Sequence, residues 1–522
     1  MDDVLTEHPP AAFRKLWEGY HKAVDKIRRA GPAICGLGLG LYLSRFLAES
    51  IPAARPLVQL LPLVIICGIL GVALVVWGRR YIPHYAPLAL LYLYIVYPFV
   101  SFHLAARLAF LVLCALLILN TQGKRGLPSW ALDLGVFGGA LALYWRTLAP
   151  TVLPADSGEF QFVSYVLGIA HPPGYPLYTL LGKLFTLIPL GDVAYRVNLL
   201  SAVIAALTLA GLYRLARQMT GSTWLGLVPA LALGASPTFW AQGTTANIRS
   251  LTALFTSWQL CFLFRYSQRR DRDSLLGFAL SFGLGMAHHG SLGLLAIPYL
   301  LYLWVVDPSL LRRWRDWLGP LAIFLASFLV FLYLPLRSLM GAPFDPVPIR
   351  SLDTFLDHVL ARGFRGDMFA FARPDLLLNR LPVLINILVF QFGYPLLAVA
   401  CLGVLGSLIW ERRLFLLFAG AFGVNAFVAI TYRAPQTVEY LLPAYVALAA
   451  LIGYGAGVLR RWRGKVVKAI LAAALLWLGG ENLSRHYPSY LALSRDTSTR
   501  EYAEALLREA PPKAVILANW HY

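Results

Sequence analysis

Two carboxylates stand three residues apart in the segment Pro154-Ala155-Asp156-Ser157-Gly158-Glu159, directly after an apolar run. If this segment turns helically, Asp156 and Glu159 lie on one face of the helix. Such a pair can supply a general base, with the second carboxylate tuning the base or holding a substrate. The alternative is a capping box, in which Asp156 is the N-cap and Glu159 is its N3 partner.

A proline-rich segment, His171-Pro172-Pro173-Gly174-Tyr175-Pro176, follows twelve residues after Glu159. Three prolines in six residues exclude a helix and predict a rigid extended turn, in which Gly174 supplies backbone freedom. The segment is either a stiff connector or the preorganised wall of a site. In the second case His171 is a candidate partner for a phosphate or a hydroxyl group.

Further ionisable and polar residues lie at the ends of apolar runs. Arg196 and Asn198 begin the next run and are candidates to line a site, although Arg196 could equally snorkel to the membrane interface. His288 and His289 end a later run. Adjacent histidines point to different helix faces, which makes a poor metal pair. We expect one of them to face the site and the other to pack.

Arginines gather after the segment Leu334-Pro335-Leu336-Arg337-Ser338, with Asp353 and Asp357 interleaved. An arginine can hold a lipid phosphate with two parallel hydrogen bonds, so this cluster is a candidate phosphate site; interfacial snorkelling is the alternative. The arginines that follow Arg337 are Arg350, Arg362, Arg365, Arg373 and Arg380.

The composition identifies the kind of molecule that must position these side chains. Of 522 residues, 58% are hydrophobic and 14% are charged, and the mean hydropathy is +0.64. These values exclude a soluble globular protein and a disordered chain. Continuous apolar runs of about 17–22 residues indicate membrane-spanning helices rather than the alternating strands of a barrel. The net charge of +19 is spread between these runs, so we expect no nucleic-acid partner.

The runs predict an all-α polytopic membrane protein with about fifteen transmembrane helices. The predicted spans are 31–48, 57–77, 83–100, 103–119, 130–148, 194–213, 223–238, 245–264, 275–289, 291–306, 318–335, 386–409, 414–431, 440–459 and 466–480.

Basic residues concentrate in alternate short connections, which places those connections and the N-terminus in the cytoplasm. The long loops 149–193 and 337–385 and the tail after 480 are then outside the cell, so we expect the chemistry at the outer face of the cell membrane. A polar stretch of about 25 residues precedes the first span, and no cleavable signal peptide is expected. The apolar run near 514–519 has strand character, which suggests that the chain is truncated or that an outer domain follows.

The five cysteines all lie in apolar runs, so we expect no disulfide framework and no zinc site. We also expect no other metal and no cofactor. The predicted domains are residues 1–127 with four extra spans, a core of residues 128–480, and the start of an outer region at 481–522.

Three motifs together resemble the transmembrane protein O-mannosyltransferase-like family of GT-C glycosyltransferases. They are Asp156-Ser157-Gly158-Glu159, the stretch Leu167–Leu177 around the proline-rich segment, and Arg196-Val197-Asn198-Leu199-Leu200-Ser201. Residues Leu334–Ser338 and Glu439–Tyr445 resemble later motifs of the family, and the resemblance covers about 130–522. One stretch differs. The family's Ala-Glu-Val-Tyr is matched here by Ala246-Asn247-Ile248-Arg249, in which a carboxylate and a phenol are replaced.

The resemblance implies a GT-C fold and an inverting, metal-independent transfer of a sugar from a polyprenyl-phosphate carrier. Mannose as the sugar, and a protein Ser/Thr hydroxyl or a glycan as the acceptor, follow from the resemblance only. Asp156 is the expected base, Glu159 orients the base or the acceptor, and Arg337, His171, Arg362 and Arg365 are expected to hold the donor phosphate. The residues expected to line the site are Pro172, Pro173, Gly174, Tyr175, Arg196, Asn198, His288, Glu439 and Tyr440.

Two alternatives belong to other functional classes. A transporter or flippase for a polyprenyl-linked sugar would place ionisable residues near the middle of spans, whereas those noted here lie at the outer ends. An inactive member of the family that acts as a scaffold is favoured only by Asn247 and Arg249.

Overall fold

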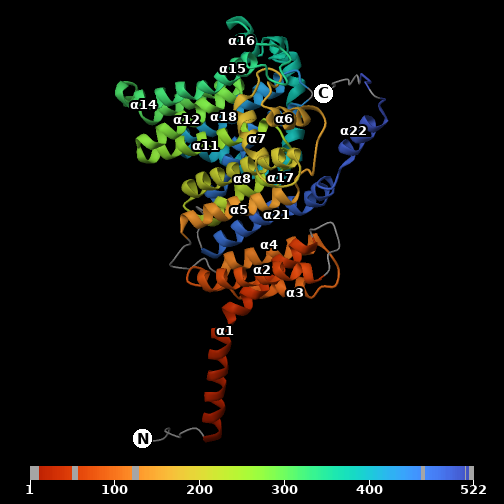
Figure 1. The fold of residues 1–522 in the computed structure, drawn as a ribbon. Coiled ribbons are helices and arrows are strands. Elements are labelled where there is room, and N and C mark those ends of the chain that lie inside the picture. The colour runs from red at the N-terminus through yellow and green to blue at the C-terminus, as the bar shows by residue number, and fades with distance from the viewer. Residues whose placement is uncertain are drawn as a thin grey trace. The chain divides into compact units, whose positions relative to one another are not determined.

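The computed structural model describes residues 11–49, 57–119, 128–434, 436–459, 465–511 and 513–515. The elements described are helices joined by turns and loops, without a strand in these ranges (Figure 1). The chain divides into two compact units, Met1–Pro128 and Ser129–Tyr522. The basic connections at 120–127 and 460–464, and most of the strand-like run at 514–519, lie outside the described residues.

The first unit is built on two long helices, α1 (Ala11–Glu49) and α2 (Leu57–Gly78). Glycines let their backbones approach closely. A Cβ atom added to Gly40 would lie 2.2 Å from the carbonyl oxygen of Cys67, and one on Gly36 would lie 2.5 Å from the Cα of Val72. The unit also contains η1 (Ala86–Leu91), α3 (Tyr92–Ile95) and α4 (Phe102–Leu119).

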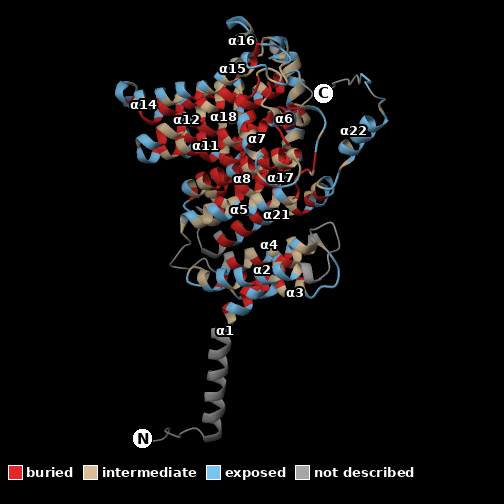
Figure 2. Ribbon diagram, viewed as in Figure 1, coloured by how far each residue is buried: buried red, intermediate tan, exposed pale blue. Residues whose placement is uncertain are grey.

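The second unit has a buried centre formed by α8 (Val193–Thr220), α11 (Arg249–Arg269) and α20 (Leu442–Leu459). Buried residues, in red, are frequent around the labels of α8 and α11 in Figure 2. Asp192 caps α8 by accepting a hydrogen bond from the backbone N–H of Tyr195. The neighbouring helices are α5 (Ser129–Arg146), α9 (Thr223–Gly234), α10 (Pro237–Thr244), α12 (Arg272–His288), α13 (Ala296–Val306), α18 (Arg412–Thr431) and α21 (Lys465–Leu493).

Several helices present apolar side chains outward, as expected for a surface in contact with lipid. The stretch Trp314–Leu339 is made of α14 (Trp314–Ser327), η4 (Phe328–Leu332) and α15 (Tyr333–Leu339). It contains an 18-residue segment with a mean hydropathy of 2.1, of whose residues only 17% are buried. In the described part of the chain, seven helices are long and apolar enough to cross a membrane, or up to eight if α9 and α10, bent by 75°, are counted together. The expected number of about fifteen spans is not confirmed.

Each predicted span contains helical residues, but some are interrupted. Residues 83–100 hold only η1 and α3, and residues 291–306 are divided between η2 (Gly290–Leu295) and α13. Helix α17 (Pro374–Trp410) is broken at Gly393, whose φ of 70° and ψ of 161° are not helical. The continuous helix α21 runs through residue 480, where the sequence predicted a domain boundary.

The two long loops contain short helices that carry the candidate residues. Residues between α5 and α8 include α6 (Ala155–Val166) and α7 (Pro176–Thr186). The second loop was predicted to extend to residue 385 and is shorter, because α17 already begins at Pro374. It contains α16 (Leu352–Val359) and η5 (Arg362–Asp367).

Candidate functional site

Asp156 and Glu159 share one face of α6 because the helix begins at Ala155, before both residues. The capping-box alternative is wrong, since Pro154 occupies the N-cap position and Asp156 lies within the first helical turn. Gly158 allows the preceding loop to fold against this turn: a Cβ atom there would lie 2.4 Å from the Leu153 carbonyl oxygen. The helix start therefore fixes where both carboxylates lie.

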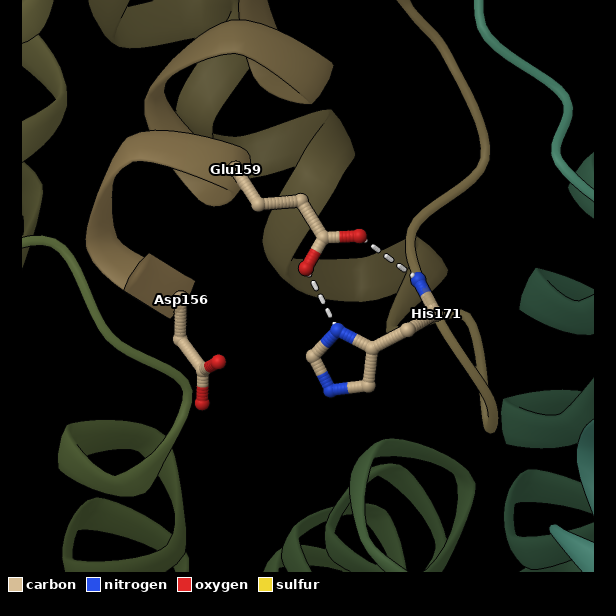
Figure 3. A group of neighbouring side chains, drawn as sticks. All are labelled: Asp156, Glu159 and His171. Carbon is tan, nitrogen blue, oxygen red and sulfur yellow. Dashed lines mark hydrogen bonds and ion pairs between the residues drawn. The ribbon is translucent and has the colours of Figure 1, made fainter. Parts of the chain in front are cut away.

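Glu159 is hydrogen-bonded to His171 through both of its carboxylate oxygens. Its two carboxylate oxygens accept hydrogen bonds from the His171 backbone N–H at 2.8 Å and from the ring nitrogen Nδ1 at 2.5 Å (Figure 3). Burial alone would lower the pKa of His171, but the hydrogen bond and charge of Glu159, together with the charge of Asp156, raise it above its ordinary value. The arrangement favours an imidazolium ion whose second nitrogen is turned away from Glu159.

Asp156 differs from Glu159 in having no hydrogen bond or ion pair within the described residues, and Figure 3 shows its carboxylate beside the imidazole. Its oxygens stay available to an incoming hydroxyl group. A carboxylate held near a histidine but left unpaired can accept a proton from a bound substrate.

The proline-rich segment is a tight wall of this site. Gly174 has φ +90°, and a Cβ atom there would lie 2.8 Å from Leu334 Cδ2 and 2.9 Å from His358 Nε2, so glycine is required for two reasons. Pro172 and Pro173 are joined by a cis peptide bond. Tyr175 adopts the left-handed conformation (φ 44°) immediately before α7, which is a strained backbone for a tyrosine.

Tyr175 is the centre of an aromatic cluster that links three segments of the chain. Its ring lies 5.5 Å from that of His171, 5.8 Å from His288 and 6.4 Å from His289, measured between centroids. Burial raises the pKa of the Tyr175 phenol, which therefore stays protonated. His288 is buried and donates from Nε2 to the Ile248 carbonyl, whereas His289 also contacts the ring of Tyr440. His288 therefore packs within the protein and His289 is the less buried of the two, which agrees with the expectation that one packs and the other faces the site.

Arg249 is the main residue that sequence analysis did not include among the site candidates. Its Nη1 forms an ion pair with Glu439 at 2.9 Å, Nη2 donates to Gln436, and the guanidinium carbon lies 4.8 Å from the centre of the Tyr440 ring. The signal was present, because Arg249 is an ionisable residue near one end of the predicted span 245–264, but it was interpreted only as a departure from the family pattern. Glu439 and Tyr440 are brought to the site by this arginine.

Asn198 and Arg196, both predicted to line the site, form hydrogen bonds that hold its framework. The Asn198 side chain is fully buried, bonds to Gln161, and also pairs with the backbone of Ala149 and Ala246. The Arg196 guanidinium donates to three carbonyl groups of the α7–α8 connection, those of Thr186, Leu190 and Gly191. Direct contact of either residue with a substrate stays a prediction.

The arginines predicted to hold phosphate lie in different environments. Arg337 donates from Nε to the Leu167 carbonyl at 2.8 Å and so secures the end of α6. Arg362 is paired with Asp353 at 3.0 Å and Asp357 at 2.6 Å, and the Arg365 side chain lies outside the described part of the structure. The structure does not bring Arg337 or Arg362 into contact with Asp156, Glu159 or His171.

A cavity of about 330 Å³ adjoins the proline-rich wall through Pro172. The rest of its lining comes from the second long loop, in which the charge of Arg362 is balanced by Asp357. The other residues that line it are Val347, Thr354, His358 and Gly363.

A metal ion is the one inorganic cofactor that the described side chains could hold here. Asp156, Glu159 and His171 each offer a ligand atom, and these atoms lie within 4.8 Å of one another. However, Glu159 Oε1 already accepts from the His171 backbone N–H, and Glu159 Oε2 from the His171 Nδ1 atom. A cation held by Glu159 Oε2 and His171 Nδ1 would have to break their hydrogen bond, so we expect proton transfer rather than metal binding here.

Comparison with solved structures relates this fold to ArnT from Cupriavidus metallidurans. The structure of ArnT bound to undecaprenyl phosphate matches with a TM-score of 0.51 and 13% identity, over 73% of this chain and 81% of ArnT. Its apo structure matches with a TM-score of 0.50 and 14% identity, over 73% and 80%. These matches confirm the expected all-α, GT-C-like fold.

Comparison with known sequences points to the same group of proteins. The mouse protein O-mannosyl-transferase TMEM260 is 31% identical over 250 residues, which are 45% of this chain and 33% of the mouse protein. The Dictyostelium discoideum protein O-mannosyl-transferase tmem260 is 25% identical over 304 residues, or 52% and 36% of the two chains. This chain thus spans about a third of the length of these relatives.

The match to a family model covers part of the site and leaves out Glu439 and Tyr440. Residues 156–311, which begin at the candidate base and include His171, Tyr175 and Arg249, match the model described as the protein O-mannosyl-transferase TMEM260 N-terminal domain. The family resemblance that the sequence motifs indicated is therefore confirmed for the part of the chain that carries the carboxylate pair and the proline-rich wall.

Proposed function

We propose that this protein is a GT-C glycosyltransferase that moves a sugar, mannose, from a polyprenyl-phosphate carrier to an acceptor hydroxyl at the outer face of the cell membrane. The acceptor class is a protein Ser/Thr hydroxyl or a glycan. The names of the sequence relatives support the mannosyl transfer, and the undecaprenyl phosphate bound to ArnT supports a lipid-linked donor.

The observation that carries the proposal is that the two carboxylates differ in their bonding: Glu159 is bonded to His171, and Asp156 is not. Asp156 is unpaired and beside the His171 ring, whereas Glu159 is fully used in orienting and charging that ring. In the proposed step, Asp156 takes the proton of the acceptor hydroxyl while the oxygen of that hydroxyl forms a bond to the anomeric carbon of the sugar. The bond from that carbon to the phosphate oxygen breaks, and polyprenyl phosphate leaves with inversion at the carbon.

Negative charge grows on the leaving phosphate, so a cation already fixed in place stabilises the transition state more than the ground state. His171 in its protonated form is one such cation, and the predicted contacts of Arg337, Arg362 and Arg365 belong to the same role. No resident cofactor or metal ion has a part in this mechanism, since the donor arrives already activated.

The test is sugar transfer from polyprenyl-phosphate mannose to a panel of acceptors by wild type and Asp156→Asn. We expect transfer to fall by about 10²–10⁴-fold, the usual effect of losing a general base. The amide is nearly isosteric, so thermal stability and membrane insertion should be unchanged. Ser157→Ala is the matched control on the next residue of α6. Turnover like wild type in Asp156→Asn would remove Asp156 from the mechanism.

The same assay separates the two alternatives. A flippase would move the lipid-linked sugar across vesicles without forming a glycosylated acceptor, and a scaffold would do neither. Glycosylated product that depends on Asp156 is expected from the proposed enzyme alone.

A further inference from the structure

Arg249 is a buried cation within the candidate site to which the mechanism above assigns no role. It occupies the first turn of α11, its side chain is 7% exposed, and its charge acts on both His171 and Tyr175. The first turn of α11 lies at the end of a predicted span on the side of the outer loops. A cation at that level can meet the headgroup of a lipid whose chain stays in the bilayer.

The hydrogen bonds of Arg249 are incomplete. The two terminal nitrogens are bonded to Glu439 and Gln436, but the buried Nε has no hydrogen-bond partner among the described residues. A buried donor without an acceptor is costly, and such groups are commonly satisfied by a ligand or a water molecule. The planar guanidinium fork matches a phosphate group, which can accept from Nε and a terminal nitrogen together.

The charges around Arg249 indicate how an anion could enter. Asp156, Glu159 and Glu439 supply three carboxylates, against the two cations Arg249 and His171. A phosphate that joined this group without any other change would add repulsion. Glu439 is the carboxylate that can move away from Arg249, because its side chain is 31% exposed and Arg249 is its only partner among the ion pairs described. Burial, and the nearby Asp156, also raise the pKa of Glu439 despite the opposing charge of Arg249.

We propose that Arg249 binds the phosphate of the lipid-linked donor and that Glu439 is its counter-ion in the empty site, displaced when the phosphate arrives. The identity of the ligand rests on the proposed function. Arg337 and Arg362, which were predicted from sequence for this role, differ in having no buried nitrogen without a partner among the described side chains: Arg337 Nε donates to the Leu167 carbonyl, and Arg362 is paired with Asp353 and Asp357.

The test is binding rather than turnover. Polyprenyl phosphate without a sugar is titrated into the full chain in nanodiscs of phosphatidylcholine, for wild type, Arg249→Lys and Glu439→Gln. We expect Arg249→Lys to weaken binding about tenfold or more, since the charge stays but the fork is lost. We expect Glu439→Gln to strengthen binding, because the competing carboxylate is gone. Arg500→Lys, an exposed arginine paired with Glu504 and outside the arginine cluster, is the control that should bind like wild type.

The double variant Arg249→Gln with Glu439→Gln is the control for folding, because it removes both charges and leaves no unpaired ion. It should remain monodisperse with a melting temperature near wild type and still lose binding. Unchanged binding in Arg249→Lys would overturn the proposal. So would weaker binding in Glu439→Gln together with a lower melting temperature, because the pair would then serve only the fold.

Two further arms identify the source of the phosphate. Inorganic phosphate should compete only weakly, and phosphatidylglycerol in the nanodisc should not compete. Full competition by phosphatidylglycerol would assign the site to bilayer lipid and overturn the donor assignment. A wild type that does not bind polyprenyl phosphate would contradict the proposed function as well. Binding that depends on Arg249 in a protein without transferase activity would support this inference and contradict the proposed function alone.

Discussion

At the residue scale, Glu159 and His171 form a unit in which the carboxylate sets the charge of the ring. The two bonds from Glu159 fix both the backbone and the Nδ1 atom of His171, so the second nitrogen faces the site. A group whose pKa is raised by folding stabilises the fold at pH below its ordinary pKa, and this contribution is lost as pH rises through the raised value. Activity that needs the imidazolium should fall over the same range.

Replacement of Glu159 by glutamine tests this unit through a pH profile. The amide keeps the size of the side chain but removes its charge, so burial then dominates and the pKa of His171 should drop. The alkaline limb of the kcat/KM profile should therefore move to lower pH in Glu159→Gln. The control is the wild-type protein measured in the same buffers, with folding followed at each pH. An alkaline limb at the wild-type position would assign it to another group.

Metal dependence is a second question at this scale, because three possible ligands meet at the site. The mutual bonding of Glu159 and His171 leads us to expect that transfer continues in the presence of excess EDTA. Adding Mn²⁺, Mg²⁺ or Ca²⁺ should then change the rate of transfer by no more than about twofold, well under about 1 kcal/mol in activation free energy. Loss of activity with EDTA, restored by one of these ions, would replace the proton-transfer geometry by a metal centre.

At the scale of the elements, α6, α8 and the loop before α11 are held in register by buried amides. Asn198 accepts from Gln161 and from the Ala246 backbone N–H, and its own amide donates to the Ala149 carbonyl. Asn198→Ala would leave these groups unpaired at a cost of about 1–3 kcal/mol each. We expect a clearly lower melting temperature and lost transfer. Leu184→Ala, at an exposed position of α7, should change neither, and a normal melting temperature in Asn198→Ala would contradict this role.

The helical elements were predictable because lipid enforces long apolar runs, and each predicted span contains helical residues. The interruptions were not, since the break at Gly393 depends on one backbone conformation inside an otherwise apolar run. The carboxylate pair and the proline-rich wall were found from local spacing. Arg249 and its contact with Glu439 join residues 190 positions apart, and no local pattern reports which distant carboxylate an arginine will meet.

At the scale of the whole molecule, the proposed chemistry requires α6 and the second outer loop to lie on the same, outer side of the membrane. The apolar exposed surface of Trp314–Leu339 and α17 is consistent with lipid contact, but the side follows only from the distribution of basic residues. That distribution places the connection between α11 and α12 in the cytoplasm. The two sides can be distinguished by the accessibility of single cysteines.

The labelling test must use exposed positions, because a buried cysteine is unreactive on either side. Arg350, in the second outer loop, and Asp273, in the first turn of α12, are both exposed, whereas the neighbouring Ser274 is fully buried. After replacement of the five native cysteines, Arg350→Cys should react with an impermeant thiol reagent in intact cells, and Asp273→Cys only after the cells are opened. Each variant must label fully in detergent, which controls for local accessibility. Labelling of position 273, but not 350, in intact cells would reverse the orientation. The carboxylate pair would then face the cytoplasm, and a donor carried in the outer leaflet could not reach Asp156.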